Sequence, residues 1–554
     1  MPERRWNFLQ GTLSRRRLLA GTTAATAGLA SLALVGCGDD DDDSNGGTTP
    51  GASSTTATGT SESGGEPRKG GTLTIASVTD FNMATGYPFV FAAENPALNY
   101  LPVESVVRYR DSLEPELVLA ERYEFNDDMT GLVITLKPDL EFHNGAPVTA
   151  DDLLFGLQVI KSPADYGITG ALQLATFGRL VTEANKLSDR EVEFKFDRPR
   201  PNMGDFFAQL NVIHAASFED IKAGRAVNGT GPYKFVSWTP GQTARFEPFE
   251  NWHDSGNDGG PYLDAVQVQF FGDSDAMGLA YESGEIDLIW GAPASLAINY
   301  KDKGLTYRAP KTGLQYLGMN VTNPLLADSR VRRAIFLALD RKRLVEEFGE
   351  GFGEITAQPW PKTSPAWDPA LDAEFYDPDE ARRLLSEAGF SQSAPINFHH
   401  RTTNEYTKLA EIIQSNLSDI GIQVNLVPTD PTQFLALLRD RKFDGLWVTA
   451  HSFSHMAPLT NFQQTYPYQV PNISYYESPT YLDIIAKLEG LDPNSDEAKE
   501  EYRRFNQLWL EDPWIAPVVE AARLDLVSER VRGYGEFFVV PSQGPVFSKV
   551  WLDG

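Results

Sequence analysis

Apolar side chains recur with two different periods along the chain from residue 70 onward. Over 70–76, apolar and small polar residues alternate, and this period of two predicts a β-strand. Residues 409–420 carry apolar side chains at helical spacing, and after Gly421 the alternation returns over 422–426. Helix, glycine and strand in this order indicate an α/β sheet. No sequence pattern recurs every 20 to 50 residues, so a solenoid is not predicted.

Capping residues mark the starts of three predicted helices. Thr149 is followed three residues later by Asp152, which forms a capping box ahead of an apolar run. Asp377 offers an N-cap with Pro378 as the first helical residue. Asp328 offers an N-cap to a third helix, whose apolar residues lie on one face.

Two sets of basic residues that suggest chemistry are better explained as scaffold. Arg330, Arg332 and Arg333 lie on the third helix, and we expect them to form a solvated face opposite its apolar stripe. His143 lies in a predicted turn that Gly145 closes, and one isolated imidazole makes neither a catalytic triad nor a metal cage. Neither set predicts a functional site.

The first 36 residues have the pattern of an export signal. Arginines at the start precede an uncharged stretch, 18–36, that is rich in Ala, Gly, Thr and Leu. Residues 14–19, SRRRLL, resemble the twin-arginine motif. Residues 34–37, LVGC, resemble a bacterial lipobox, in which the cysteine is lipidated and becomes the first mature residue. We therefore expect lipidation at Cys37 rather than a membrane span, for which 18–36 is too polar.

The composition of 37–66 predicts a disordered tether. Five aspartates at 39–43 precede a tract of Gly, Ser and Thr, which cannot bury a core. The mature protein should therefore lie outside the cytoplasm, at the cell surface or on the periplasmic side, held to the membrane by lipid.

Charge and cysteine content exclude several classes of function. The 554 residues include 76 acidic and 48 basic side chains, a formal net charge of -28. This excess would repel a nucleic-acid backbone. One cysteine excludes a disulfide framework and a zinc site of paired thiolates. The length predicts about three domains.

Five segments, in chain order, resemble the family 5 extracellular solute-binding proteins, which are the receptors of peptide, nickel and related ABC importers. The segments are PELVLAE at 115–121 with LEFHNGAPVTADD at 140–152, NGTGPYKF at 228–235, SGEID at 283–287, DSRVRRAI at 328–335 and YDPDEA at 376–381. Together they span most of the predicted mature chain.

The resemblance implies a two-lobed, periplasmic-binding-protein-like α/β fold with an extra inserted domain, in which helices flank mixed sheets. Its hinge would be two crossover strands near 314–320 and 514–519. Domain I would comprise 67–100, 226–313 and 516–554, domain II would be inserted at 101–225 to complete lobe 1, and domain III, 314–515, would form lobe 2. The family further implies a monomer without cofactor or enzymatic activity. It would hold its solute between closing lobes and deliver it to the importer's permease subunits.

One segment departs from the family's peptide receptors, which carry there an acid that pairs with the peptide ammonium. No carboxylate occurs between Asp444 and Glu477. The segment offers rings instead, and the predicted ligand-binding residues are Trp447, His451, Phe453 and His455. We expect them to contact a neutral or weakly charged solute, such as an oligosaccharide, in preference to a zwitterionic short peptide. Another lobe could supply the acid, which keeps oligopeptides possible, and Trp447 fits the core as well as the cleft.

Three alternatives stay open from the sequence. His451 and His455 are four residues apart, which would suit a receptor for nickel or a metal chelate. A secreted hydrolase is a different class, but no Gly-x-Ser-x-Gly or His-Glu-x-x-His motif occurs. A binding protein that serves a sensor or chaperones folding, rather than an importer, would have the same sequence features.

Overall fold

The computed structural model describes residues 66–553 with internal gaps. The residues left out within this range are 79, 82–86, 90–99, 110–113, 169–173, 259, 304, 309–312, 363, 372–374, 453–456, 522 and 536–544. The predicted export signal, Cys37 and almost all of the predicted tether lie outside the described residues.

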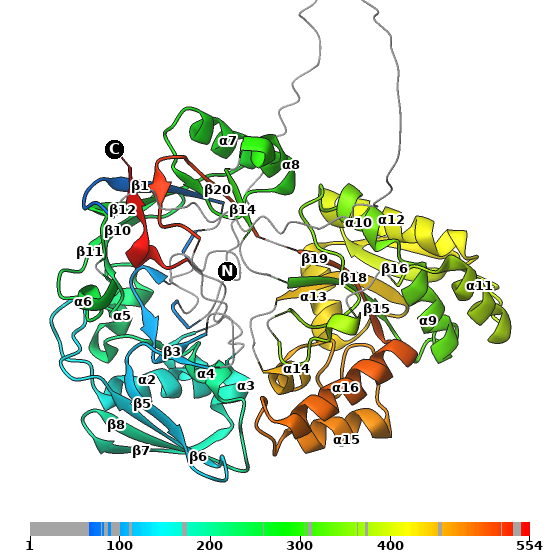
Figure 1. The fold of residues 1–554 in the computed structure, drawn as a ribbon, viewed down its shortest axis with the longest axis horizontal. Helices are drawn as coiled ribbons and strands as arrows, with labels where there is room; N and C mark the ends of the chain where they lie inside the picture. The colour runs from blue at the N-terminus through cyan, green and yellow to red at the C-terminus, as the bar shows by residue number, and fades with distance from the viewer. Residues whose placement is uncertain are drawn as a thin grey trace, which may run out of the picture. The chain divides into compact units, whose positions relative to one another are not determined.

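A seven-stranded mixed sheet forms the core of lobe 1 (Figure 1). The strand order is β10 (Tyr233–Thr239), β11 (Thr243–Pro248), β12 (Ala265–Phe270), β1 (Thr72–Ser77), β13 (Leu288–Ile289), β20 (Leu524–Val527) and β14 (Thr306–Arg308). β1 pairs in parallel with β12 and β13, and the remaining pairs are antiparallel. The sheet thus joins three separated parts of the chain. The strand predicted over 70–76 is confirmed as β1.

Between β1 and β10 the chain forms a four-stranded antiparallel sheet. Its order is β5 (Ala120–Phe125), β6 (Gly131–Leu136), β8 (Glu191–Phe196) and β7 (Val181–Ser188). Helix α2 (Ala150–Lys161) contacts β7 and β8, and it begins at the predicted capping box. The Asp152 carboxylate accepts from both the backbone N–H and the hydroxyl of Thr149, each at 3.0 Å. The division into three domains with the boundaries given above stays a prediction.

A five-stranded mixed sheet forms the core of lobe 2. Its order is β17 (Val424–Thr429), β16 (Ile396–Arg401), β18 (Leu446–Ser452), β15 (Gly313–Met319) and β19 (Ile515–Ala521). The helices predicted after Asp328, after Asp377 and over 409–420 are present. They are α9 (Ser329–Ala338), α11 (Pro378–Glu387) and α12 (Asn404–Asp419). α12 is followed by Gly421 with a φ of 91° and then by β17, so the predicted helix, glycine and strand are confirmed. The N-caps Asp328 and Asp377 are confirmed too.

The prediction of a solvated arginine face on α9 is wrong for Arg332. Only 3% of this residue is exposed. Its guanidinium donates to the carbonyl oxygens of Leu326, Ala327 and Pro513, and it pairs with Asp512. Arg332 therefore ties the start of α9 to the segment that leads into β19. The charge of Arg332 therefore stabilises the fold and is not available to a ligand.

The chain passes between the two large sheets twice, and the described residues that flank the two crossovers are aligned with one another. The first crossover runs from Arg308, the end of β14, to Gly313, and the second from Ala521 to Leu524, the start of β20. Arg308 aligns with Leu524 in one sheet, and Gly313 aligns with Ala521 in the other. Gly313 also aligns with Ser452, the last residue of β18. Both crossovers therefore meet the lobe 2 sheet at the edge where its parallel strands end.

A glycine-rich loop after α10 (Arg341–Glu347) adds a contact between the lobes. Glu354 exchanges two backbone hydrogen bonds of 3.0 Å with Glu520 of β19. Phe352, which is 4% exposed, packs in a hydrophobic cluster that otherwise belongs to lobe 1 and includes Leu524 and Leu526 of β20. Lobe 2 thus supplies one side chain to the core of lobe 1, beside the crossovers.

Trp447, on β18, is a core residue that packs against the neighbouring strand β15. None of its surface is exposed, and its ring stacks on Phe443 with centroids 4.9 Å and planes 10° apart. Gly318 lies opposite Trp447 in the β15–β18 pair. A Cβ added at Gly318 would lie 2.1 Å from the indole ring, so only glycine allows the tryptophan to pack there.

We expect Gly318→Ala to destabilise the protein, although alanine suits a strand better than glycine does. The added methyl must displace Trp447, and overpacking of this kind costs about 1–3 kcal/mol. Denaturant unfolding followed by tryptophan fluorescence measures the loss. Gly272→Ala is the matched control, because nothing lies within 4 Å of its added Cβ. Equal stability of the two variants would contradict this packing.

Candidate functional site

The carboxyl ends of the parallel strands define the candidate site. In open α/β sheets, ligands bind in the crevice outside these ends. In lobe 2 the parallel strands β16, β17 and β18 end at Arg401, Thr429 and Ser452. In lobe 1 the parallel strands β1 and β13 end at Ser77 and Ile289. The crossovers join these two edges, so side chains along them are the candidates for contact with a solute.

Arg401 is the principal candidate on the lobe 2 edge. It is the last residue of β16, half-buried, with its guanidinium carbon 4.8 Å from the Tyr406 ring centre and 4.5 Å from that of Phe434. One nitrogen donates to the Thr449 hydroxyl at 3.0 Å. Across the residues that the structure describes, no carboxylate forms a salt bridge with Arg401. A guanidinium has five N–H donors, so Arg401 can still bind a carboxylate in bidentate fashion.

Tyr406 and Gln315 extend this polar edge toward the first crossover. The Tyr406 hydroxyl donates to the Gln315 side-chain oxygen at 3.2 Å. Burial raises the pKa of Tyr406, although the Arg401 charge opposes this, so the phenol stays protonated at neutral pH. Gln315 lies on β15. The cation, the phenol and the amide thus come from three different elements of lobe 2.

The four residues predicted to bind ligand have different positions. Trp447 is buried against β15, so its ring has no exposed surface with which a solute could stack. His451 is 9% exposed, and its Nε2 lies 3.0 Å from the Tyr468 hydroxyl. Phe453 and His455 fall outside the described residues. Contact of His451, Phe453 and His455 with a solute therefore stays a prediction.

Sequence reasoning missed Arg401. Residues 396–401 alternate apolar and polar side chains before a helix, so a strand that ends in a cation was visible in the sequence. The missing information was that this strand is parallel to its neighbours and that Arg401 forms no salt bridge with a described carboxylate. His451 lies two residues after Thr449 on β18 and therefore on the same face as the hydroxyl that Arg401 contacts.

The lobe 1 edge carries a cation that is already neutralised. The Arg523 guanidinium lies 3.8 Å from the Trp290 ring centre and pairs with Asp525 at 2.9 Å. The Asp525 carboxylate also accepts from the Gly291 backbone N–H at 3.0 Å and from the Tyr534 hydroxyl at 2.7 Å. This buried cluster fixes the end of β13 next to the second crossover. Trp290 is only 3% exposed, so this cluster belongs to the core of lobe 1 rather than to an open surface.

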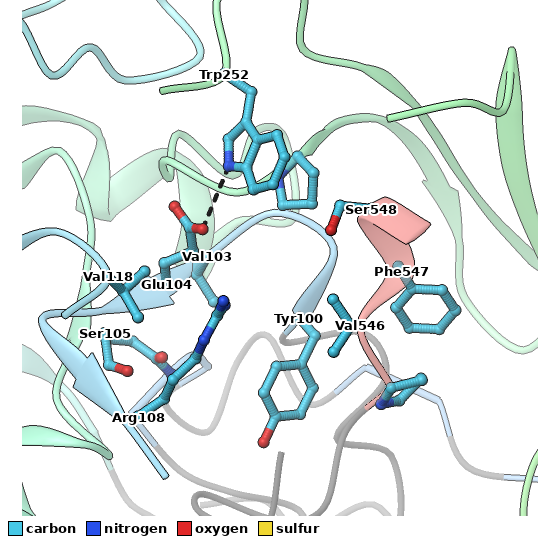
Figure 2. A pocket seen from close by; sticks show the side chains of 13 residues that line it. Tyr100, Val103, Glu104, Ser105, Arg108, Val118, Trp252, Val546, Phe547 and Ser548 are labelled. Atoms are coloured by element: carbon cyan, nitrogen blue, oxygen red, sulfur yellow. Dashed lines mark hydrogen bonds between the residues drawn. The ribbon is translucent and has the colours of Figure 1, made fainter. Parts of the chain in front are cut away.

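A pocket with about 540 Å³ of empty volume, including space open to solvent, lies within lobe 1 (Figure 2). Its charged side chains already have partners. Glu104 lies 2.9 Å from His253 and accepts from Trp252 at 3.3 Å, and Arg108 pairs with Glu116 at 3.3 Å. Burial alone would raise the pKa of Glu104, but His253 and Arg108 lower it below its ordinary value. The pocket therefore offers a solute little uncommitted charge.

His143, assigned to a turn, holds two segments of lobe 1 together. Its Nε2 lies 2.9 Å from the Gly231 carbonyl oxygen and its Nδ1 3.3 Å from that of Val227. Burial lowers the pKa of His143 even though both carbonyls favour the charged form. The ring is therefore a structural bridge.

The described part of the chain shows neither a metal cluster nor a membrane-spanning helix. No group of three or more His, Cys, Asp or Glu side chains in that part is arranged to hold a metal ion. None of the helices described there has both the length and the apolar character needed to span a bilayer.

Comparison with known proteins identifies relatives of this chain. The model of bacterial extracellular solute-binding proteins, family 5 middle region, matches residues 114–469. The oligopeptide-binding protein AppA of Bacillus subtilis (strain 168) is 25% identical over 405 residues, which cover 66% of this chain and 70% of that protein. The glutathione-binding protein GsiB of Salmonella typhi is 26% identical over 457 residues, which cover 77% and 84%.

Solved structures with the same fold include two that hold different ligands. DppA from Helicobacter pylori in complex with the peptide STSA has a TM-score of 0.70 at 20% identity, covering 88% of this chain and 99% of that one. NikA from Brucella suis in complex with Fe(III)-EDTA has a TM-score of 0.75 at 19% identity, covering 87% and 100%. These likenesses confirm the predicted two-lobed, periplasmic-binding-protein-like fold. With the family match, they place this chain among the bacterial extracellular solute-binding proteins of family 5.

Proposed function

We propose that this protein is the extracytoplasmic substrate-binding component of an ABC importer. It captures a solute between its two lobes and delivers it, chemically unchanged, to the permease subunits. The family and the paired crossovers support this role, because a hinge between two lobes allows closure around a ligand. The observation that carries the proposal is Arg401, a guanidinium at the carboxyl edge of the sheet that forms no salt bridge among the described residues, although its charge acts on the nearby Glu405 carboxylate.

The geometry favours a solute that carries a carboxylate. Arg401 is held between two rings, so its planar guanidinium is oriented before a ligand arrives, and this lowers the entropic cost of binding. The stretch between Asp444 and Glu477 offers no acid for an ammonium group. Glutathione and oligopeptides, which name the relatives, carry carboxylates as well as ammonium groups. We infer that this chain binds the carboxylate and does not require the ammonium.

We expect Arg401→Gln to weaken binding of carboxylate-bearing solutes while the fold stays intact. A hydrogen bond to a charged group contributes about 1.5–3 kcal/mol, which corresponds to roughly a tenfold to hundredfold loss of affinity. Thermal-shift titration with N-acetylated peptides, each as a free acid and as a C-terminal amide, tests this. The free acid should raise the melting temperature of the wild type and the amide should not.

Arg439→Gln is the control for Arg401→Gln, because Arg439 is an exposed arginine on α13 (Pro431–Asp440), in the same lobe. It should leave the response to the free acid unchanged. Equal binding of acid and amide would contradict the ligand class, and so would a requirement for a free amino group. Recovery of a hydrolysed peptide would instead contradict the receptor role and favour the hydrolase alternative.

The same proposal places the protein at the outer face of the cell membrane, anchored through Cys37. Cys37 is the only cysteine of the chain, and residues 34–37 resemble a lipobox. Stable anchoring takes more than one acyl chain, which a diacylated cysteine supplies. Residues 37–66 would then tether the lobes to the anchor.

We expect Cys37→Ser to release the protein from the membrane fraction. Without the thiol no lipid can be attached, so the exported variant should appear in the soluble extracytoplasmic fraction. Fractionation and metabolic labelling with a fatty acid measure this. Conversely, a variant that stays firmly in the membrane would show that residues 18–36 are an uncleaved span.

A further inference from the structure

A buried carboxylate from the inserted segment reaches a helix of lobe 2. Asp205, on the short helix α4 (Gly204–Phe207), is 1% exposed. Its Oδ2 accepts from the Thr460 hydroxyl at 2.6 Å and from the Ala457 backbone N–H at 3.2 Å. The side-chain amide nitrogen of Asn202 donates hydrogen bonds to the Thr460 hydroxyl oxygen and to the Gln463 side-chain oxygen, each at 3.0 Å. More than 250 residues separate the two sides of this contact.

The contact has a specific physical cause, which is a missing helix cap. Helix α14 (Pro458–Gln464) begins after Ala457, and no side chain at that N-cap position accepts a hydrogen bond. The first N–H groups of a helix have no partner within the helix, and a negative charge near them is favourable. Asp205 supplies both the acceptor and the charge from another part of the chain. It therefore caps α14 in place of a residue of α14's own segment.

The backbone next to Asp205 is closely packed. A Cβ added at Gly204 would lie 1.9 Å from the Tyr109 hydroxyl oxygen, so only glycine fits before Asp205. Burial raises the pKa of Tyr123, and the Asp205 charge raises it further. The phenol therefore stays neutral beside the carboxylate. Asp205 thus reaches α14 from a closely packed part of the inserted segment.

A second contact between the same two regions is weaker. Arg198 pairs with Glu489 at 2.8 Å, and the Arg198 side chain is 52% exposed. Exposed ion pairs of this kind contribute little, because water and salt screen them. The buried hydrogen bonds of Asp205 and Asn202 are consequently the stronger link.

We propose that Asp205, Asn202 and Thr460 form a clasp that holds the inserted segment of lobe 1 on lobe 2 before any solute is bound. The clasp sets how much of the ligand-free receptor is already closed. A ligand that binds the closed form gains apparent affinity in proportion to the closed fraction, so the clasp tunes affinity without touching the solute. Asp205 is then a positioning residue for α14, which directly follows the segment that carries Phe453 and His455. The clasp does not depend on which solute is bound.

The solute-free protein tests the clasp directly. The Cys37→Ser background contains no other cysteine, so Asp189→Cys and Asp496→Cys introduce two spin-label sites without competing thiols. The side chains at these positions are 86% and 96% exposed, one in the inserted segment and one in lobe 2. Pulsed electron paramagnetic resonance then gives the distance distribution between the lobes. No solute is added, so failure of the clasp is distinguishable from failure of the proposed ligand class.

We expect Thr460→Val, which keeps the shape of the side chain but removes its hydroxyl, to shift the distribution toward longer distances. Loss of a hydrogen bond to a buried charge should raise the ratio of open to closed molecules about tenfold. Thr460→Ser retains the hydroxyl and should restore the wild-type distribution. Thr465→Val is the matched control, because that buried hydroxyl bonds to Asn461 within lobe 2. It should leave the inter-lobe distance unchanged.

Several outcomes would overturn the clasp. An unchanged distribution in Thr460→Val would show that the hydroxyl does not hold the lobes. An equal shift in Thr460→Ser and Thr460→Val would attribute the opening to altered packing. If Thr460→Val does not fold, Asn202→Ala removes the amide side of the clasp and reads the same distance. A wild-type distribution in that variant would overturn the proposal equally.

Discussion

The pairing of β15 with β19 is the constraint on which the other features depend. All seven residues of β15 are buried, and the strand is hydrogen-bonded on both sides, to β18 and to β19. Because β15 begins where β18 ends, the pairing fixes the edge at which the chain leaves lobe 2. That edge also holds Arg401. A slip by one residue would turn every side chain of β15 to the opposite face and would remove Gly318 from its place opposite Trp447.

The lobes are linked by contacts of different strength and different chemistry. Near the crossovers the link is apolar, since Phe352 is buried among lobe 1 side chains, and it is not screened by salt. Between the inserted segment and α14 the link is polar and made of few hydrogen bonds. Apolar side chains near a hinge can shift slightly while the lobes rotate. Hydrogen bonds are directional, so they are either formed or broken when the lobes move apart. The two kinds of contact therefore suit a pivot and a switchable closure, respectively.

Local signals in the sequence were sufficient for several elements and insufficient for the site. Capping boxes and the glycine after α12 act over a few residues, so Thr149, Asp377 and Gly421 predicted their elements correctly. Arg332 was misassigned because its partners, Pro513 and Asp512, are about 180 residues away and no periodicity records them. The burial of Trp447 depends on Gly318, its neighbour in β15, and this contact also joins residues far apart in the sequence. Arg401 became visible as a candidate only when the strand order showed that β16 ends beside its parallel neighbours.

The seven-stranded sheet has a consequence for how the protein is made. Its central strand β1 comes from the start of the described chain, and β20 comes from near its end, so β13 has no neighbour on one side until residues 524–527 exist. Contacts of such large sequence separation slow folding, because loop-closure entropy must be overcome before they form. A chain interrupted before β20 would leave one edge of β13 unpaired. An apolar strand edge that is normally buried can then pair with other chains. Late truncations should therefore aggregate during synthesis rather than yield a smaller working receptor.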